Sequence, residues 1–228
     1  MARIILITGA NRGLGRELAA QLAADGDTVL LSARNADAAA KAAEEISGDV
    51  HPIQLDTSDQ ESIAAAAKKI EVEYGRVDVL VNNVGGLFDY EQQPSTVDLG
   101  KVQDVFDINL FSKWRTTQAI LPLIRKSANG RIVNVSSEAA SLTRMGAYTS
   151  AYSASKAALN ALTRALAAEL ADENIIVHSA SPGWTATDLG GEGGRPVAEG
   201  AASIKHVVNL PASAGTGGFY QDEEILPW

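Results

Sequence analysis

One stretch near the N-terminus decides the fold: Ile4-Ile5-Leu6-Ile7-Thr8-Gly9-Ala10-Asn11-Arg12-Gly13-Leu14-Gly15. Its first four residues form an apolar run without alternation, which is typical of a strand buried on both faces. The glycines that follow predict a tight turn, and Leu14, Leu18 and Leu22 have the spacing of one apolar helix face. Strand, turn and helix together predict the first unit of a parallel α/β sheet.

The same alternation of strand and helix continues along the chain. Strands are predicted at residues 4–7, 28–31, 50–55, 77–81, 131–136 and 175–180. Helices are predicted at residues 14–24, 36–47, 59–74, 96–126 and 150–172. Pro122 lies inside the fourth helix, so we expect a kink or a break there. The pattern predicts one domain over residues 1–228, with a parallel sheet covered by helices on both faces.

Composition excludes several classes of function. The chain has 228 residues, 46% of them hydrophobic, which suits one globular domain. It has no cysteine, which excludes a disulfide scaffold, a thiolate nucleophile and a cysteine-ligated metal. Its three histidines are scattered, so no metal site is predicted.

Charge and hydropathy bear on partners and location. The formal net charge of −9 argues against nucleic acid and anionic lipid as partners. No apolar run approaches the length of a secretory signal or a membrane-spanning helix. We therefore expect a cytoplasmic protein that contacts no membrane.

The glycine turn is the first candidate binding site. In parallel α/β sheets, the first strand-to-helix turn binds a dinucleotide with its pyrophosphate on the helix N-terminus. Gly9 permits the tight exit from the strand, Gly13 lets the backbone approach the phosphates, and Gly15 lets helix and strand pack closely. The alternative is an ordinary glycine-rich turn, which its position in the first unit disfavours.

Charges near the second strand indicate which dinucleotide binds. An acidic residue there would hold the 2′-hydroxyl of NAD, but the chain has Ala33 and Arg34, with Arg12 in the first turn. Two guanidinium groups suit a 2′-phosphate, so we predict NADP(H) in preference to NAD(H). The alternative is that both arginines are solvated surface charges.

Two further strand ends carry polar residues where ligands bind in such sheets. Asp56 and Thr57 follow the third strand, and Asn83-Val84-Gly85 follows the fourth. Asp56 can accept a hydrogen bond from an adenine amino group. The alternative is that these residues serve only the turns, where Asp, Asn and Gly are common.

The segment Tyr152-Ser153-Ala154-Ser155-Lys156 carries the strongest chemical signal. Tyr152 and Lys156 lie one helical turn apart on one face. A nearby ammonium favours the phenolate and lowers a tyrosine pKa, so Tyr152 can exchange a proton with an alcohol or ketone near neutral pH. Ser137 ends a strand at the same sheet edge and can hydrogen-bond the substrate oxygen.

In their order and spacing, these motifs resemble the short-chain dehydrogenase/reductase family over nearly the whole chain, including Pro182-Gly183. The resemblance implies a Rossmann fold, a doubly wound parallel sheet of about seven strands. It implies that Tyr152 is the acid/base, that Ser137 polarises the carbonyl and that Lys156 holds the nicotinamide ribose. Asn109 matches the family asparagine that supports a proton-relay water.

The resemblance and the turn positions together give a set of cofactor contacts. The predicted cofactor-binding residues are Gly9, Asn11, Arg12, Gly13, Leu14, Gly15, Arg34, Asp56, Thr57, Asn83, Val84, Gly85, Tyr152, Lys156, Pro182, Gly183, Thr185 and Thr187. Thr187 matches the threonine that contacts the nicotinamide carboxamide. Val84 replaces the usual alanine beside the cofactor, and Thr185 stands where the family often has an aliphatic residue.

Residues 182–191 and the C-terminal Gly217-Gly218-Phe219-Tyr220 resemble the carbonyl-reductase-like branch, whose members reduce ketones, aldehydes or quinones with NADPH. We therefore predict hydride transfer between nicotinamide and an apolar carbonyl substrate. The candidate substrate-binding residues are Leu87, Tyr148, Trp184 and Leu189, and residues 183–206 are predicted to form a substrate lid. The alternative is an NADP(H)-binding sensor or regulator on the same fold with little turnover.

One face of the helix at 150–172 carries alanines in place of the usual charged residues. They are Ala154, Ala157, Ala158, Ala161, Ala165 and Ala168. A flat face lets another helix approach closely, so we predict a homodimer or homotetramer through this helix. The alternative is that alanine is simply a good helix former.

Overall fold

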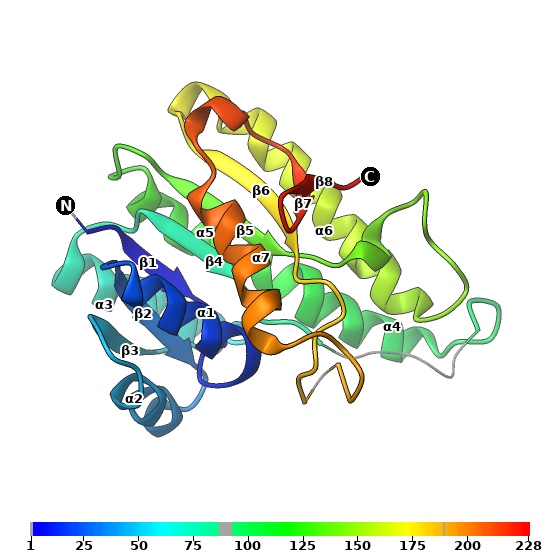
Figure 1. The fold of residues 1–228 in the computed structure, drawn as a ribbon, viewed down its shortest axis with the longest axis horizontal. Helices are drawn as coiled ribbons and strands as arrows, with labels where there is room; N and C mark the ends of the chain where they lie inside the picture. Colours follow the sequence, from blue (N-terminus) through cyan, green and yellow to red (C-terminus); the bar gives the residue numbers. More distant parts are fainter. Residues whose placement is uncertain (1, 87–92, 189) are drawn as a thin grey trace.

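The computed structural model describes residues 2–86, 93–188 and 190–228, whose strands form one sheet (Figure 1). Its spatial order is β3-β2-β1-β4-β5-β6-β7-β8. The strands are β1 (Ile4–Ile7), β2 (Thr28–Ala33), β3 (Val50–Gln54), β4 (Val79–Asn82), β5 (Arg131–Val135), β6 (Ile176–Ser181), β7 (Phe219–Gln221) and β8 (Glu224–Ile225). Neighbours pair in parallel except β7 and β8. The predicted doubly wound sheet is confirmed, with a short antiparallel eighth strand beyond the seven that are parallel.

Helices cover both faces of the sheet, as predicted. The helices are α1 (Gly13–Ala24), α2 (Ala36–Glu44), α3 (Gln60–Tyr74), α4 (Leu99–Phe106), α5 (Ser112–Ile124), α6 (Ser150–Glu169) and α7 (Val197–Asn209). Helices α1, α2 and α7 contribute to one core, with α1 and α7 in front of the sheet in Figure 1. Helices α3, α5 and α6 contribute to the core on the other face.

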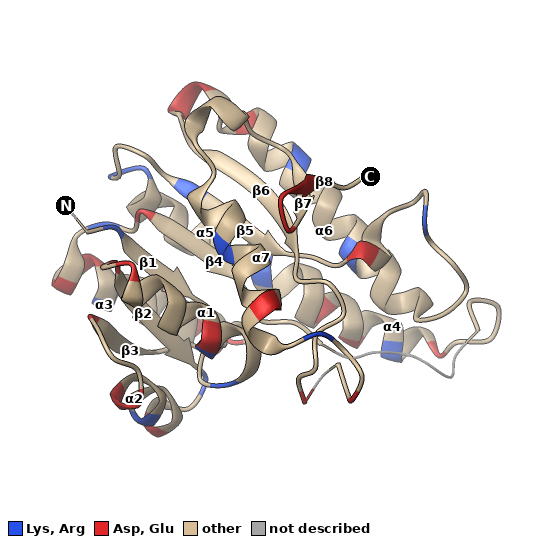
Figure 2. Cartoon of the chain, viewed as in Figure 1, with Lys and Arg blue, Asp and Glu red and all other residues tan. Residues whose placement is uncertain are grey.

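The first strand shows why this arrangement forms. Ile5 and Ile7 pack into the core of α1, α2 and α7, whereas Leu6 packs into the core of α3, α5 and α6. All three side chains are fully buried. An apolar run therefore suits β1 because alternate side chains enter two different cores. Figure 2 shows how little charge the strands carry, and Arg131 is the one charged residue in β1 to β7.

The helix predicted at 96–126 is interrupted, but at a different residue from the one expected. A π-helical turn, η1 (Asp107–Phe111), joins α4 to α5. The break expected at Pro122 is absent because α5 continues through it to Ile124. Pro122 lies in the last turn of α5, where a missing N–H and a displaced carbonyl disturb few helical hydrogen bonds.

The segment 183–206, predicted to form a lid, contains a loop and most of a helix. Residues 183–188 and 190–196 lie in a loop in which Arg195 N donates to Trp184 O at 2.8 Å and Ala186 N donates to Arg195 O at 2.9 Å. Helix α7 begins at Val197 and buries Ala201 and Ile204 in the core beside α1. A substrate lid in this region stays a prediction, and residues 197–206 of it lie in α7. Over the described residues, no helix has the length and apolarity needed to cross a lipid bilayer.

Candidate active site

The carboxyl ends of strands β1 to β6 meet at a cleft of about 860 Å³. The structure brings most of the predicted site residues to this cleft. Those that line it are Gly9, Asn11, Arg12, Gly13, Leu14, Gly15, Arg34, Asp56, Thr57, Asn83, Val84, Gly85, Ser137, Tyr152, Lys156, Pro182, Gly183, Trp184, Thr185 and Thr187. Neither Asn109 nor Tyr148 is part of this lining, and Leu87 and Leu189 lie outside the described residues.

The glycine turn has the geometry that a dinucleotide phosphate requires. Gly9 and Gly13 have φ values of 62° and 54°, in the left-handed region that favours glycine. A Cβ atom at Gly15 would lie 2.8 Å from Gly9 O and 2.9 Å from Ala10 Cα, so a side chain there would push α1 away from β1. The residue before α1, Arg12, makes no side-chain cap, which leaves the first backbone N–H groups of the helix to a ligand. The turn therefore fits a phosphate group.

Asn83 braces this turn from the neighbouring strand. Its Nδ2 atom donates to Thr8 O at 2.9 Å and to Gly9 O at 3.1 Å. The hydroxyl oxygen of Thr8 accepts from Asn83 N at 2.9 Å and from Val84 N at 3.1 Å. The ends of β1 and β4 are thus joined by side chains. Asn83 lines the cleft, but its amide nitrogen is already engaged in holding the turn.

Tyr152 and Lys156 lie buried at the inner end of the cleft, on α6. They are 8% and 3% exposed, and Lys156 Nζ is 5.5 Å from the centre of the Tyr152 ring. Lys156 Nζ donates to Val135 O at 2.9 Å, at the end of β5. Burial lowers the pKa of Lys156 to about 7, because the charged form loses its hydration. Ser137 lies two residues beyond the end of β5, and its hydroxyl oxygen accepts from Ala139 N at 3.2 Å.

Asn109 lies behind the cleft, fully buried in the η1 turn. Its Oδ1 atom accepts from Gly86 N at 3.0 Å, and its Nδ2 atom donates to Gly86 O at 2.8 Å. The side chain therefore fixes the backbone that follows β4. Among the described residues, no group of His, Asp or Glu side chains is arranged to hold a metal ion.

Comparison with known proteins decides the family. A family model for short chain dehydrogenases matches residues 3–196. The chain belongs to the short-chain dehydrogenase/reductase family. The short-chain dehydrogenase anuI of Penicillium roqueforti is 36% identical over 219 residues, which cover 88% of this chain and 86% of that protein. Family membership establishes an oxidoreductase that acts on CH–OH or C=O groups with a nicotinamide cofactor.

Solved structures agree with this assignment. The carbonyl reductase Sniffer of D. melanogaster superposes with a TM-score of 0.89 at 27% identity, over 100% of both chains. A 3-ketoacyl-(acyl-carrier-protein) reductase from Brucella melitensis, complexed with NADH, superposes with a TM-score of 0.84 at 27% identity, over 96% of this chain and 95% of that one.

This short-chain dehydrogenase/reductase has two arginines in the lining of the cleft, Arg12 and Arg34, and they differ in their contacts. Arg12 forms an ion pair with Asp188 from the 183–196 loop, and both side chains are largely exposed. Arg34 lines the cleft near Asp56. Hydrogen bonds from Ser58 hold the pKa of Asp56 below its usual value, with a smaller contribution from the charge of Arg34. The two arginines predicted to share one phosphate are therefore not equally available.

Two threonines of the 183–196 loop, Thr185 and Thr187, line the cleft. Thr185 is 6% exposed and its hydroxyl donates to Gly183 O at 3.1 Å, so it shapes the turn after β6. A Cβ atom at Gly13 would lie 3.8 Å from Thr187 Cγ2, which places this loop against the glycine turn. Trp184 lines the cleft and is 58% exposed, whereas Tyr148 is 79% exposed and does not line it.

Lys113 is a residue of this region that sequence reasoning missed. It is 2% exposed, and its Nζ atom donates to Val84 O, beside the predicted cofactor site. A signal existed, because Lys113 has the helical spacing of Thr116, Thr117 and Ile120, which form the buried face of α5.

Proposed function

We propose that this short-chain dehydrogenase/reductase is an NADP(H)-dependent reductase, reversible as an alcohol dehydrogenase, for apolar ketones, aldehydes or quinones. The observation that carries the proposal is the burial of Tyr152 beside Lys156 at the end of a cleft whose other end is the glycine turn. When bound, the nicotinamide cofactor supplies or receives the hydride.

The chain's own residues supply the proton and the polar contacts. Tyr152 donates its phenolic proton to the carbonyl oxygen during reduction and takes it back during oxidation. Ser137 accepts from Ala139 N, which leaves its hydroxyl hydrogen to donate to the same oxygen. The Lys156 ammonium favours the phenolate of Tyr152, and its contact with Val135 O holds it in place.

The preference for NADP(H) is the part of the proposal that needs its own test. Arg34 supports it, because a guanidinium at the rim of the cleft suits a 2′-phosphate. Arg12 forms an ion pair with Asp188. For Arg12 to contact the 2′-phosphate of NADP(H), the phosphate must replace the Asp188 carboxylate as its partner. The similar reductase solved with NADH is a reason to measure both dinucleotides.

The substrate class rests on aromatic and apolar residues near the cleft mouth. Trp184 lines the cleft, and its indole N–H donates to Gly190 O at 2.9 Å, so the ring is held by the loop. We include Tyr148, Leu87 and Leu189 in the proposed substrate site from the sequence alone. The similarity to the Sniffer carbonyl reductase supports this class of substrate. The cytoplasmic location stays a prediction from the sequence.

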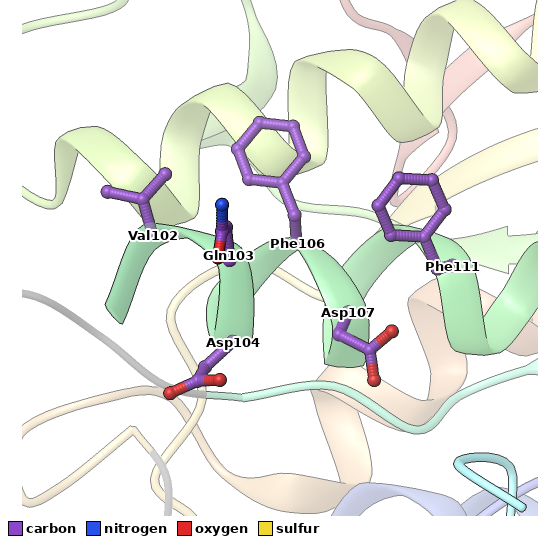
Figure 3. Close-up of a pocket in the computed structure, with 6 residues that line it drawn as sticks. All are labelled: Val102, Gln103, Asp104, Phe106, Asp107 and Phe111. Carbon is purple, nitrogen blue, oxygen red and sulfur yellow. The ribbon is translucent and has the colours of Figure 1, made fainter. Parts of the chain in front are cut away.

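We also propose that the protein is a homodimer or homotetramer through α6. Ala154, Ala161, Ala165 and Ala168 are exposed on this helix. A hollow of about 500 Å³ lies beside it, on α4 and η1. Figure 3 shows Phe106 and Phe111 directed to the α6 side of this hollow, and Asp104 and Asp107 directed to the other side. Apolar side chains next to a flat alanine face suit contact with a second copy.

A panel assay tests the proposed reaction. Purified protein is mixed with NADPH and aliphatic or aromatic ketones, aldehydes and quinones, and loss of absorbance from the reduced nicotinamide is followed. Turnover of one or more apolar carbonyls is the expected result. Tight NADPH binding without turnover of any carbonyl would contradict the reductase and favour a sensor.

A further inference from the structure

Lys113 is a fully enclosed lysine that the proposed reaction does not use. It lies on α5 and is 2% exposed, and its amine donates to the carbonyl of Val84. Burial, and after it the positive charge of Lys156, holds the pKa of Lys113 well below its usual value. Burying an amine costs stability, and an apolar side chain would fill the same space without that cost. Packing alone therefore does not account for an amine at this position.

Three polar side chains from three helical segments converge on Gly85. A Cβ atom at Gly85 would lie 3.1 Å from Asn109 Oδ1, 3.2 Å from Lys156 Nζ and 3.6 Å from Lys113 Nζ. Gly85 has no side chain, so the polar ends of Asn109, Lys156 and Lys113 come close to its Cα atom. Lys113 donates to the carbonyl of Val84, which lies just beyond β4. Lys156 donates to the carbonyl of Val135, the last residue of the adjacent strand β5. The two lysines thus reach one point from two different helices, α5 and α6.

No described carboxylate compensates this pair of amines. The only charged group that acts on Lys113 within the described part of the chain is Lys156. Asp107, on the adjoining η1 turn, is paired with Arg115 at 2.9 Å. The remaining titratable neighbour is the phenol of Tyr152, next to Lys156. Two amines in one enclosed space accept a first proton more readily than a second, because like charges repel strongly where water is absent.

We propose that Lys113 is a positioning residue of the proton-transfer centre. Lys113 and Lys156 form one coupled pair of amines beneath Gly85, and Lys113 sets the charge that Lys156 presents to Tyr152. The effect on Tyr152 rests on the proposed function, but the coupling between the amines does not. The two are therefore tested separately, and the coupling is tested first in protein without cofactor.

The first experiment measures the coupling in the unaltered chain. Protein labelled with [6-¹³C]lysine is titrated, and the Cε resonances of Lys113 and Lys156 are followed by NMR and assigned through Lys113→Met and Lys156→Arg. Coupling predicts that both resonances move in the same two pH steps. Two independent single-site curves would overturn the proposal.

The second experiment removes and restores the amine. In Lys113→Met, the two-step titration of Lys156 is expected to become a single step at the higher pH, because no second positive charge then enters the same space. The exposed Lys101→Met on α4 is the matched control and leaves the titration unchanged. An unmoved Lys156 titration in folded Lys113→Met would contradict the coupling.

Chemical rescue separates the amine from its packing. The chain has no cysteine, so Lys113→Cys can be alkylated at that position alone in denaturant and then refolded. Aminoethylation restores an amine and is expected to restore the parent titration, whereas a neutral alkyl group of similar size is not. Equal titrations for the two products would mean that Lys113 only fills space.

A turnover measurement then tests the link to Tyr152. If Lys113 sets the charge on Lys156, the pH profile of carbonyl reduction shifts upward in Lys113→Met and returns on aminoethylation. An unshifted profile in an active variant would remove the effect on Tyr152. An inactive parent protein would contradict the proposed function and leave the amine coupling to be judged by NMR.

Discussion

Gly15 shows how one residue joins fold and site. Its place in the glycine spacing predicts close packing of α1 against β1, and the structure gives the reason, because a Cβ atom would lie 2.6 Å from Asn83 Nδ2 and 2.8 Å from Gly9 O. Gly9 O is a backbone atom, so it cannot move aside as the end of a flexible side chain can. Asn83 shows the opposite case. Its bracing of Thr8 and Gly9 depends on tertiary contact between two strands, so the sequence indicated only that it lies at a strand end.

Gly15→Ala is expected to destabilise the fold by about 1–3 kcal/mol, which is the usual cost of forcing a methyl group into a packed site. The melting temperature should fall by roughly 2–4 °C for each kcal/mol in a domain of this size. Gly146→Ala is the matched control, since nothing lies within 4 Å of a Cβ atom there. Thermal unfolding measures both variants, and equal melting temperatures would contradict the packing argument.

Arg34→Asp tests the cofactor preference. A charged hydrogen bond contributes about 1.5–3 kcal/mol, so NADPH affinity should fall by roughly 10- to 100-fold while NADH affinity changes little. Arg144→Asp, an exposed arginine outside the cleft lining, serves as the control. Binding is measured through the fluorescence of the reduced nicotinamide. A similar loss for both dinucleotides would show that Arg34 does not read the 2′-phosphate.

At the scale of elements, local patterns predict most of what the structure has. The alternation of buried strands and amphipathic helices is local, so β1 to β6 and α1 to α3 were found to within a few residues. The η1 turn was not, because it depends on hydrogen bonds between Asn109 and the distant Gly86. The sequence analysis includes most of α7 in the predicted lid. The glycine-rich segment before this helix favours a loop, and the apolar face that packs on α1 is not evident from the local pattern. Elements that depend on remote partners are the ones that a local pattern cannot specify.

The alanine face of α6 makes a prediction at this scale. Ala161→Glu is expected to convert the protein to a monomer, because a charge would be buried between two closely packed helices. Ala64→Glu, on the exposed face of α3, is the control and leaves the assembly unchanged. Sedimentation equilibrium at micromolar protein measures the mass. A parent protein that is already monomeric under these conditions would contradict the proposed assembly.

At the scale of the whole molecule, stability should depend on pH through His178. This residue is 1% exposed on β6, and its Nδ1 atom accepts from Gly218 N at 3.0 Å. Burial, with a smaller contribution from Arg131, lowers the pKa of His178 to about 4. In the unfolded chain His178 is protonated below about pH 6.5, whereas in the folded chain it is protonated only below about pH 4. Stability is therefore complete above pH 6.5 and is lost as the pH falls toward 4.

The loss across this window is on the order of 3 kcal/mol, since one pKa unit corresponds to about 1.4 kcal/mol. His178→Asn keeps an acceptor for Gly218 N and has no ring to protonate, so its stability should lose most of this pH dependence. His206→Asn, on α7, keeps the parent behaviour. Urea unfolding at a series of pH values measures the effect. Parallel pH curves for the parent and His178→Asn would contradict it.

The central claim is that Tyr152 exchanges the proton with the substrate, and one single-turnover measurement tests it most directly. The protein is saturated with NADPH, mixed with a carbonyl that the panel assay has identified, and followed as the nicotinamide absorbance decays. Tyr152→Phe is expected to bind NADPH as the parent does and to lose at least about 100-fold in rate, the usual contribution of a positioned general acid. A Tyr152→Phe protein that reduces the carbonyl at the parent rate would contradict the account.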